Sequence, residues 1–131
     1  MTPDQITLVK NSWAKVAPIQ EAAAELFYNR LFELDPAVKS LFKGDMKEQG
    51  RKLMQMIDVA VRGLDRIETL VPAIQAMGAR HAGYGVTADH YGTVASALLW
   101  TLEKGLGADF TPATKEAWTE VYTVLAATMQ S

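Results

Sequence analysis

Apolar residues recur at intervals of three and four over most of this chain, which is the spacing that places them on one face of an α-helix. No window alternates apolar and polar residues between hairpin turns, and there is no internal repeat. We therefore expect an all-α fold of about six to eight helices, in one domain over residues 1–131. The period alone does not decide between helices that cross at an angle and a plainer bundle. The helical stripes fall in residues 6–16, 19–34, 49–64, 71–81, 91–102 and 118–129, with tight turns in 36–42.

Proline, glycine and small polar residues mark where these helices begin and end. Thr2, Pro3 and Gln5 form a capping-box signature at the start of the first helix. Pro18 interrupts the first stripe, and the pair Asp35-Pro36 ends the second, because the residue before a proline avoids helical backbone angles. Three more helices are expected to begin, the first at Pro72, the second at either Thr87 or Asp89, and the third at Thr111-Pro112. Gly83 and Gly85 are expected to end the first of these, and Gly105-Leu106-Gly107 the second.

His81, one of two histidines in the chain, lies on the apolar face of the helix predicted over residues 71–81. Ile74, Met77 and Gly78 precede it at helical spacings, so the imidazole belongs to the inward stripe. A single inward histidine is more often a neutral, hydrogen-bonded core residue than a metal ligand. His81 on its own therefore does not establish a site.

Composition and charge exclude several classes of function. The chain has a formal net charge of −2 with no basic run, which argues against nucleic acid as a ligand. It has no cysteine, so disulfides, thiolate metal sites and thiol nucleophiles are excluded. The longest apolar stretches are too short to cross a bilayer, and no basic segment followed by an apolar run opens the chain. We expect a soluble, cytoplasmic protein without membrane insertion.

Seven short motifs, none specific alone, follow one another along nearly the whole chain. They are Ser12-Trp13, Phe27-Tyr28-x-x-x-Phe32, Asp35-Pro36-x-Val38-x-x-Leu41-Phe42, Gln49-x-x-x-Leu53, Arg80-His81-x-x-Tyr84, His90-Tyr91 and Ala117-Trp118-x-x-x-Tyr122. Their order and separations resemble those of bacterial globins, both the single-domain haemoglobins and the haem domain of flavohaemoglobins. The resemblance implies a globin fold around a pocket for haem b (iron protoporphyrin IX).

Carried over residue by residue, the resemblance makes His81 the proximal ligand of the haem iron. The second imidazole nitrogen then needs a hydrogen-bond acceptor, and in relatives a tyrosine at the place of Tyr91 lies close on this side. Lys52 would reach a haem propionate, the alternative being a solvated surface lysine. The remaining residues expected to line the macrocycle are Val38, Phe42, Leu53, Ile57, Val86, Val94 and Leu98.

On the opposite face, Tyr28 and Gln49 match the positions of distal hydrogen-bond donors. Oxygen bound to ferrous haem carries partial negative charge, so a phenol O–H and an amide N–H aimed at it would stabilise it. Without the haem register, Tyr28 reads as a core tyrosine and Gln49 as an exposed amide. His90 is expected on the proximal side, and ligation of the iron by two histidines is not expected.

The resemblance implies binding of oxygen and other diatomic gases with high affinity and slow oxygen release. Nitric oxide dioxygenation is a further expectation, and it requires an external reductase because the sequence has no flavin or nicotinamide motif. The alternatives are a haem-based gas or redox sensor and a haem-free helical interaction module. We expect a monomer or a weak homodimer.

Overall fold

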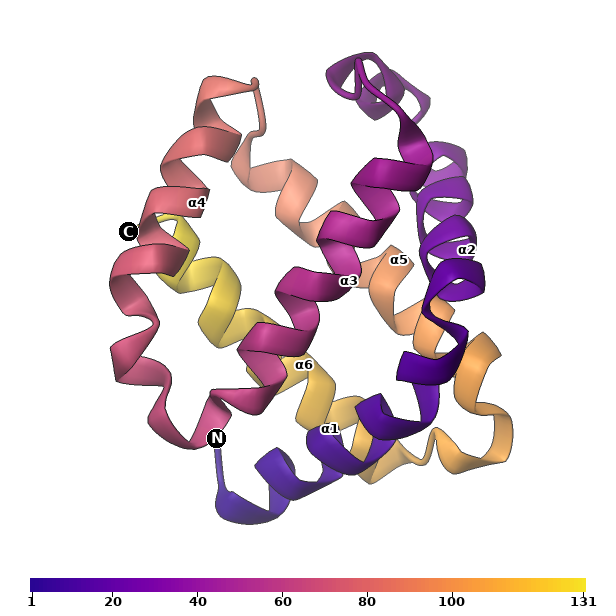
Figure 1. Cartoon of the computed structure of the whole chain (residues 1–131), viewed down its shortest axis with the longest axis vertical. Helices are drawn as coiled ribbons and strands as arrows, with labels where there is room; N and C mark the ends of the chain where they lie inside the picture. Colours follow the sequence, from indigo (N-terminus) through magenta and orange to yellow (C-terminus); the bar gives the residue numbers. More distant parts are fainter.

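The computed structural model describes all 131 residues as an all-helical fold without strands (Figure 1). It contains six α-helices and four 3-10 segments, in agreement with the number of helices that the sequence predicts. In chain order these are α1 (Pro3–Val16), η1 (Ala17–Ile19), α2 (Gln20–Leu34), η2 (Pro36–Leu41), α3 (Met46–Arg62), η3 (Leu64–Thr69), α4 (Val71–Gly83), α5 (Ala88–Leu106), η4 (Gly107–Asp109) and α6 (Pro112–Met129).

Most helix boundaries fall where the sequence predicts them. Thr2 and Gln5 form the capping box of α1, and Thr87 rather than Asp89 is the N-cap of α5. Helix α3 begins earlier than its apolar stripe indicates, because the side chain of Asp45 accepts a hydrogen bond from the backbone N–H of Lys47 and caps the helix there. The chain leaves α4 through Gly85, whose φ of +96° suits a residue without a side chain.

The larger core lies where α1, α3, α5 and α6 meet, and we call it the tryptophan core. Trp13 of α1 and Trp118 of α6 pack with ring centroids 6.2 Å apart, and the Nε1–H of Trp118 donates to the hydroxyl of Ser12 at 2.8 Å. Each large apolar side chain buried here contributes about 1.5–3 kcal/mol. The other buried members are Val9, Val16, Ala23, Ala24, Met54, Val61, Leu64, Leu102, Leu106, Ala117 and Val121.

A smaller cluster joins α2, η2 and α5, and we call it the tyrosine cluster. Its centre is Tyr28, whose ring meets Phe42 edge to face at a centroid distance of 5.3 Å. Leu53 of α3 and Leu98 of α5 pack against both this cluster and the tryptophan core. They therefore bridge the two apolar regions. The buried members of the cluster are Phe27, Tyr28, Leu31, Val38 and Ala97.

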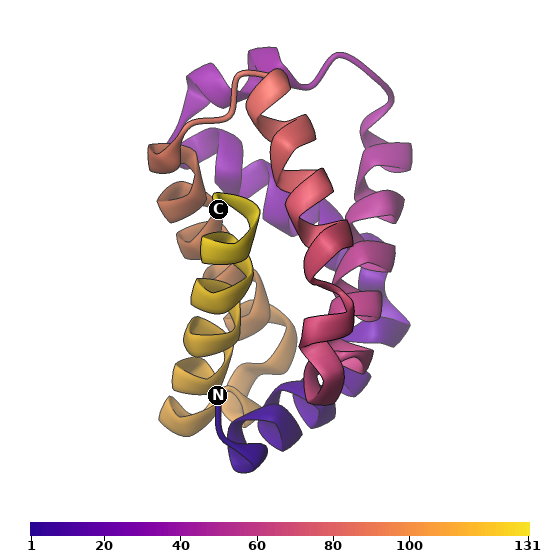
Figure 2. The ribbon, with the colours of Figure 1, turned by 90° about the vertical axis from the view of Figure 1, so that its left-hand side faces the viewer.

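Two glycines permit the closest approaches between helices. A Cβ on Gly50 would lie 2.9 Å from the Cβ of Ala24, where α3 crosses α2. A Cβ on Gly78 would lie 2.7 Å from the Cα of Met129 and nearer still to its carbonyl group, so α4 rests directly on the last turn of α6. Figure 2 shows these two helices next to one another. The helix that carries His81 is thus positioned by the end of α6.

The inward stripes predicted from the sequence are not uniformly buried. On α3 the fully buried residues are Gly50, Met54 and Val61, whereas Leu53 and Ile57 of the predicted stripe are only half-buried. The same division runs along α5, where Ala97 and Leu102 are buried and the stripe residues before them are half-buried. Each of these helices therefore has one face in a core and a second apolar face beside it. No helix of the fold combines the length and the apolar character needed to span a membrane.

Candidate functional site

His81 lies in the last turn of α4 with its two ring nitrogens in different surroundings. Nδ1 is 2.7 Å from the backbone carbonyl oxygen of Met77, one turn earlier. Because a carbonyl only accepts, Nδ1 carries the proton and donates, which leaves Nε2 with its lone pair. Nε2 has no hydrogen-bond partner, and the side chain is half-buried. This is the state in which a histidine ligates a metal ion.

The hydrogen-bond acceptor for His81 is thus a backbone atom and not Tyr91. No side-chain hydrogen bond joins Tyr91 to His81; instead the Tyr91 backbone carbonyl accepts from the hydroxyl of Tyr122 at 2.7 Å. Burial raises the pKa of both tyrosines, and for Tyr122 the nearby Tyr91 raises the pKa further. The two hydroxyls therefore stay protonated at neutral pH.

Tyr28 and Gln49 come together from α2 and α3. The Tyr28 side chain is 6% exposed. Burial raises its pKa, and the nearby Gln49 side chain offsets part of that rise, so the net shift is upward. At neutral pH the phenol is consequently a neutral O–H donor with an amide beside it. The sequence predicted these two residues as a pair, and the fold places them close to one another.

The apolar residues predicted to line the site fall into two groups. Val38 is buried in the tyrosine cluster, with Phe42, Leu53, Val94 and Leu98 packed against it. Ile57 packs instead against the tryptophan core. Except for Val38 these side chains are half-buried. Leu53 and Ile57 lie on the second apolar face of α3, Val94 and Leu98 lie on that of α5, and Phe42 follows η2.

The last predicted residues lie outside these clusters. The backbone N–H of Val86 donates to the His81 carbonyl oxygen at 3.0 Å, which ties the turn after α4 to the end of that helix. Lys52 is exposed and makes no ion pair within the chain. It remains available as a surface cation on α3.

His90 has a structural role that its sequence position did not reveal. Its Nδ1 accepts from the backbone N–H of Thr87 at 3.0 Å and completes the capping box of α5, while Nε2 lies 3.8 Å from Asp35. A ring nitrogen that accepts a capping hydrogen bond has no free lone pair for a metal. This supports the expectation that His81 alone of the two histidines acts as a ligand.

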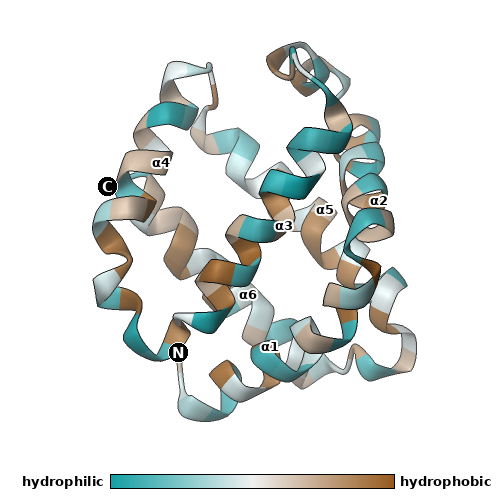
Figure 3. Ribbon diagram, in the orientation of Figure 1, coloured by the Kyte–Doolittle hydropathy of each residue, from teal (hydrophilic) through white to brown (hydrophobic).

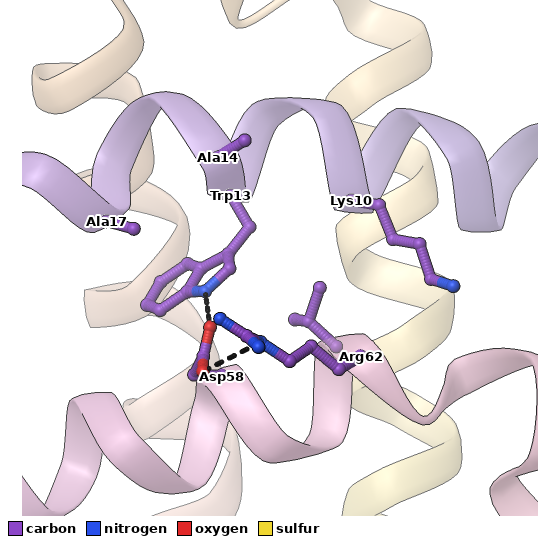
Figure 4. A pocket seen from close by; sticks show the side chains of 7 residues that line it. Lys10, Trp13, Ala14, Ala17, Asp58 and Arg62 are labelled. Atoms are coloured by element: carbon purple, nitrogen blue, oxygen red, sulfur yellow. Dashed lines mark hydrogen bonds and ion pairs between the residues drawn. The ribbon is translucent and has the colours of Figure 1, made fainter.

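A separate surface hollow of about 320 Å³ lies between α1 and α3 (Figure 4). Its polar side chains already have partners: the Nε1–H of Trp13 donates to Asp58 at 3.0 Å, and Arg62 pairs with the other Asp58 oxygen at 3.0 Å. Asp58 therefore holds Trp13 in the tryptophan core. The helical stripe did not single out Asp58, because its role depends on a residue 45 positions away in the chain.

Comparisons with known proteins agree with this arrangement. A family model described as Globin matches residues 25–129. Neuroglobin of Danio rerio is 30% identical, over 93% of this chain and 86% of its own length. A flavohemoprotein of Xylella fastidiosa is 33% identical over 95% of this chain, which spans only 32% of that longer protein.

Among solved structures, one similar chain is an engineered carbene transferase derived from a protein described as a nitric oxide dioxygenase of Rhodothermus marinus. The two chains superpose with a TM-score of 0.87 and 31% sequence identity, over 97% of this chain and 89% of the other. The family match extends from α2 to the end of α6 and includes every element that carries a candidate site residue. The chain therefore belongs to the globin family, whose members hold haem and bind diatomic gases.

Proposed function

We propose that this globin binds haem b with His81 as the axial ligand of the iron. The residues present fit that group: a free imidazole nitrogen, half-buried apolar faces on α3 and α5, and a helix α4 that packs mainly against α6. Haem without covalent thioether links suits a chain that has no cysteine. When bound, the ferrous haem supplies an iron centre that binds diatomic gases and draws electron density onto oxygen.

We propose Tyr28 and Gln49 as the donors to that oxygen. The observation that carries the proposal is the buried, protonated Tyr28 hydroxyl with the Gln49 amide beside it. A hydrogen bond to a charged group is worth about 1.5–3 kcal/mol, which is about a tenfold to hundredfold change in affinity. Two such donors predict high affinity and slow release of oxygen.

Oxygen dissociation from Tyr28→Phe tests this role. Loss of the phenol O–H should speed oxygen release by about tenfold or more, with little change for carbon monoxide, which carries less negative charge. Gln49→Leu should show a second acceleration of the same sign. Tyr84→Phe is the matched control, because it also removes a phenol hydroxyl but from a side chain that is 65% exposed. Unchanged oxygen release in Tyr28→Phe would refute the donor role.

We further propose that the protein turns over nitric oxide. The reaction combines nitric oxide, oxygen and one electron into nitrate, so an external reductase must supply one electron per cycle. The support is the similarity to a protein described as a nitric oxide dioxygenase and to a flavohemoprotein. Nitrate formed per nitric oxide consumed, measured with a reductase added in trans, tests it. Oxygen binding without nitrate formation would leave reversible gas binding as the function.

A further inference from the structure

Charge is distributed unevenly between two parts of this globin. Residues 36–57 contain five cationic and two anionic side chains, and Arg80 is the only Asp, Glu, Lys or Arg between positions 70 and 88. These two segments have a formal charge of +4, while the remainder of the chain has −6, which together give the −2 of the whole. Asp35 and Asp89 border these segments and lie at the same end of the fold, which lowers the local charge to +2. This end is therefore basic in a protein that is acidic overall. We call its cations the cationic rim: Lys39, Lys43, Lys47, Arg51, Lys52 and Arg80.

The cationic rim is exposed and largely without partners in the chain. All six side chains are exposed, and only Arg51 is ion-paired, with Glu48 at 3.1 Å. Elsewhere on the surface Lys10 and Lys15 are paired with Asp65 and Asp109, whereas Arg66, Lys104 and Lys115 are exposed and unpaired but do not cluster in the sequence. Figure 3 shows the hydrophilic colour on the first turns of α3 and near the end of α4. These lysines are therefore free to interact with another molecule.

The rim lies at the end of the molecule where the His81 helix stops. The turn after α4 reaches the end of η2, since a Cβ on Gly85 would lie 3.5 Å from the Leu41 side chain. Figure 1 shows η2 and the start of α3 at the same end of the molecule as the end of α4, which lies across from them in this view. Tyr84 is 65% exposed here, and its ring centroid is 6.4 Å from that of His81 in an edge-to-face arrangement. An exposed aromatic ring thus stands next to the proposed iron ligand.

We propose that the cationic rim is the docking surface for an anionic electron-donating protein that returns the ferric haem to the ferrous state. This inference rests on the proposed function, because it names the surface through which the external reductase acts. One electron passes from the reduced partner to the iron, and the partner is left one-electron oxidised. Unpaired surface lysines steer an anionic partner over distances of about a Debye length. Tyr84 gives the encounter an aromatic contact beside His81.

Stopped-flow reduction of the ferric haem protein tests the rim, with an acidic flavodoxin in its hydroquinone form as the electron donor. Steering by the rim predicts a second-order rate that falls as ionic strength rises. The double variant Lys43→Glu/Lys47→Glu should lower that rate at low salt by about tenfold or more. The matched control is Lys104→Glu/Lys115→Glu, which changes the net charge equally at exposed lysines on α5 and α6. It should slow reduction much less.

Separate readouts distinguish this inference from the proposed function. Reduction by uncharged photoreduced lumiflavin, haem content and oxygen release should be the same in the wild type and both double variants. A wild-type protein that fails to hold haem would refute the proposed function itself. Equal slowing by both pairs, or no salt dependence in a haem-loaded protein, would overturn the docking surface alone.

Two further outcomes would assign the rim to another partner and overturn the proposal. Loss of haem from Lys43→Glu/Lys47→Glu would mean that these lysines retain the cofactor. Binding of the wild type, but not of this variant, to phosphatidylglycerol vesicles, with unchanged reduction by flavodoxin, would make the rim a membrane-facing surface. Lys43→Gln/Lys47→Gln provides a milder test, with a smaller loss of rate in the same direction.

Discussion

The tryptophan core and the region around His81 are both built from amphipathic helices, but they differ in how completely their polar and apolar groups are satisfied within the chain. In the core, the indole N–H groups of Trp13 and Trp118 both have partners within the chain, and Trp118 is 3% exposed. Around His81, one ring nitrogen has no partner and the apolar side chains that face the site are half-buried. The core is complete without any other molecule. The His81 region has donor atoms and apolar surface to offer, which is the arrangement expected of a binding site.

The same contrast between buried and half-buried apolar residues is found on two faces of a single helix. On α3, Met54 and Val61 face the tryptophan core, while Leu53 and Ile57 lie on the neighbouring half-buried face. A change on the first face should therefore alter the free energy of unfolding, and a change in the His81 region should alter binding. Substitutions in the two regions therefore separate loss of ligand binding from loss of stability.

Replacement of His81 by alanine should abolish ligation of the iron and leave the fold intact. Absorption spectra of the haem-supplied wild type should show a Soret band that shifts on reduction and on exposure to carbon monoxide. In His81→Ala this band should be lost or altered, while the helical circular dichroism signal persists. Ligation that survives in His81→Ala would show that another residue binds the iron.

Truncation of Trp118 should lower the stability of the fold without removing the proposed iron ligand. Trp118→Ala removes a large buried side chain and should lower the free energy of unfolding by about 3–5 kcal/mol. Trp118→Phe removes mainly the hydrogen bond to Ser12 and should cost about 1–3 kcal/mol. Urea unfolding of the haem-free protein measures both. A loss from Trp118→Phe as large as that from Trp118→Ala would mean that the hydrogen bond, and not packing, dominates this position.

Gly78→Ala should affect both regions, because Gly78 lies where α4 rests on α6. The added methyl group meets the backbone of Met129, so one helix must shift, at a cost of about 1–3 kcal/mol. Movement of α4 also displaces His81 and should speed haem release. Gly83→Ala is the matched control in the same helix, since its Cβ meets nothing within 4 Å. Equal unfolding free energies for the two variants would contradict the close approach.

Alkaline pH should weaken the fold through its buried tyrosines. Tyr28 and Tyr122 both have a raised pKa in the folded state, so the folded protein retains protons that the unfolded chain loses. Their contribution is complete below a pH of about 10 and declines above it, by about 1.4 kcal/mol per pH unit for each group. Urea titrations between about pH 8 and pH 11 measure the decline.

Tyr122→Phe isolates one of these groups. At neutral pH it should lower the free energy of unfolding by about 0.5–1.5 kcal/mol, through loss of the hydrogen bond to the Tyr91 carbonyl. As the pH rises the variant should lose less stability than the wild type, so the two curves converge. Parallel curves would mean that Tyr122 ionises equally in the folded and unfolded chains.

The helices can be predicted from the sequence because they depend on local spacing, and the family resemblance can be recognised because short motifs follow one another in a fixed order. Pro18 and Thr87 act through their own backbone neighbourhood, and each marks a boundary in the structure as expected. The pairing of Tyr28 with Gln49 was foreseen through the resemblance and not through periodicity. A helical period alone would have left them as a core tyrosine and a surface amide.

What the sequence could not supply depends on contacts between distant segments or on backbone atoms. The acceptor that orients His81 is the backbone carbonyl of Met77. Every residue has such a carbonyl, so the sequence does not mark this one. The need for glycine at position 78 follows from where α6 ends. The division of the α3 stripe into a buried and a half-buried face arises from the angle at which α3 crosses its neighbours, which the period does not encode.

The hydrogen bond between Trp118 and Ser12 joins residues 106 positions apart, so the first and last helices close on each other. During synthesis, α1 therefore emerges from the ribosome long before α6, the helix that carries Trp118. Trp13 can meet Asp58 once α3 has been made, but its packing against Trp118 has to wait for α6. We expect nascent chains that stop before α6 to be captured by chaperones and degraded by proteases. The tryptophan core should therefore close only once α6 has been translated.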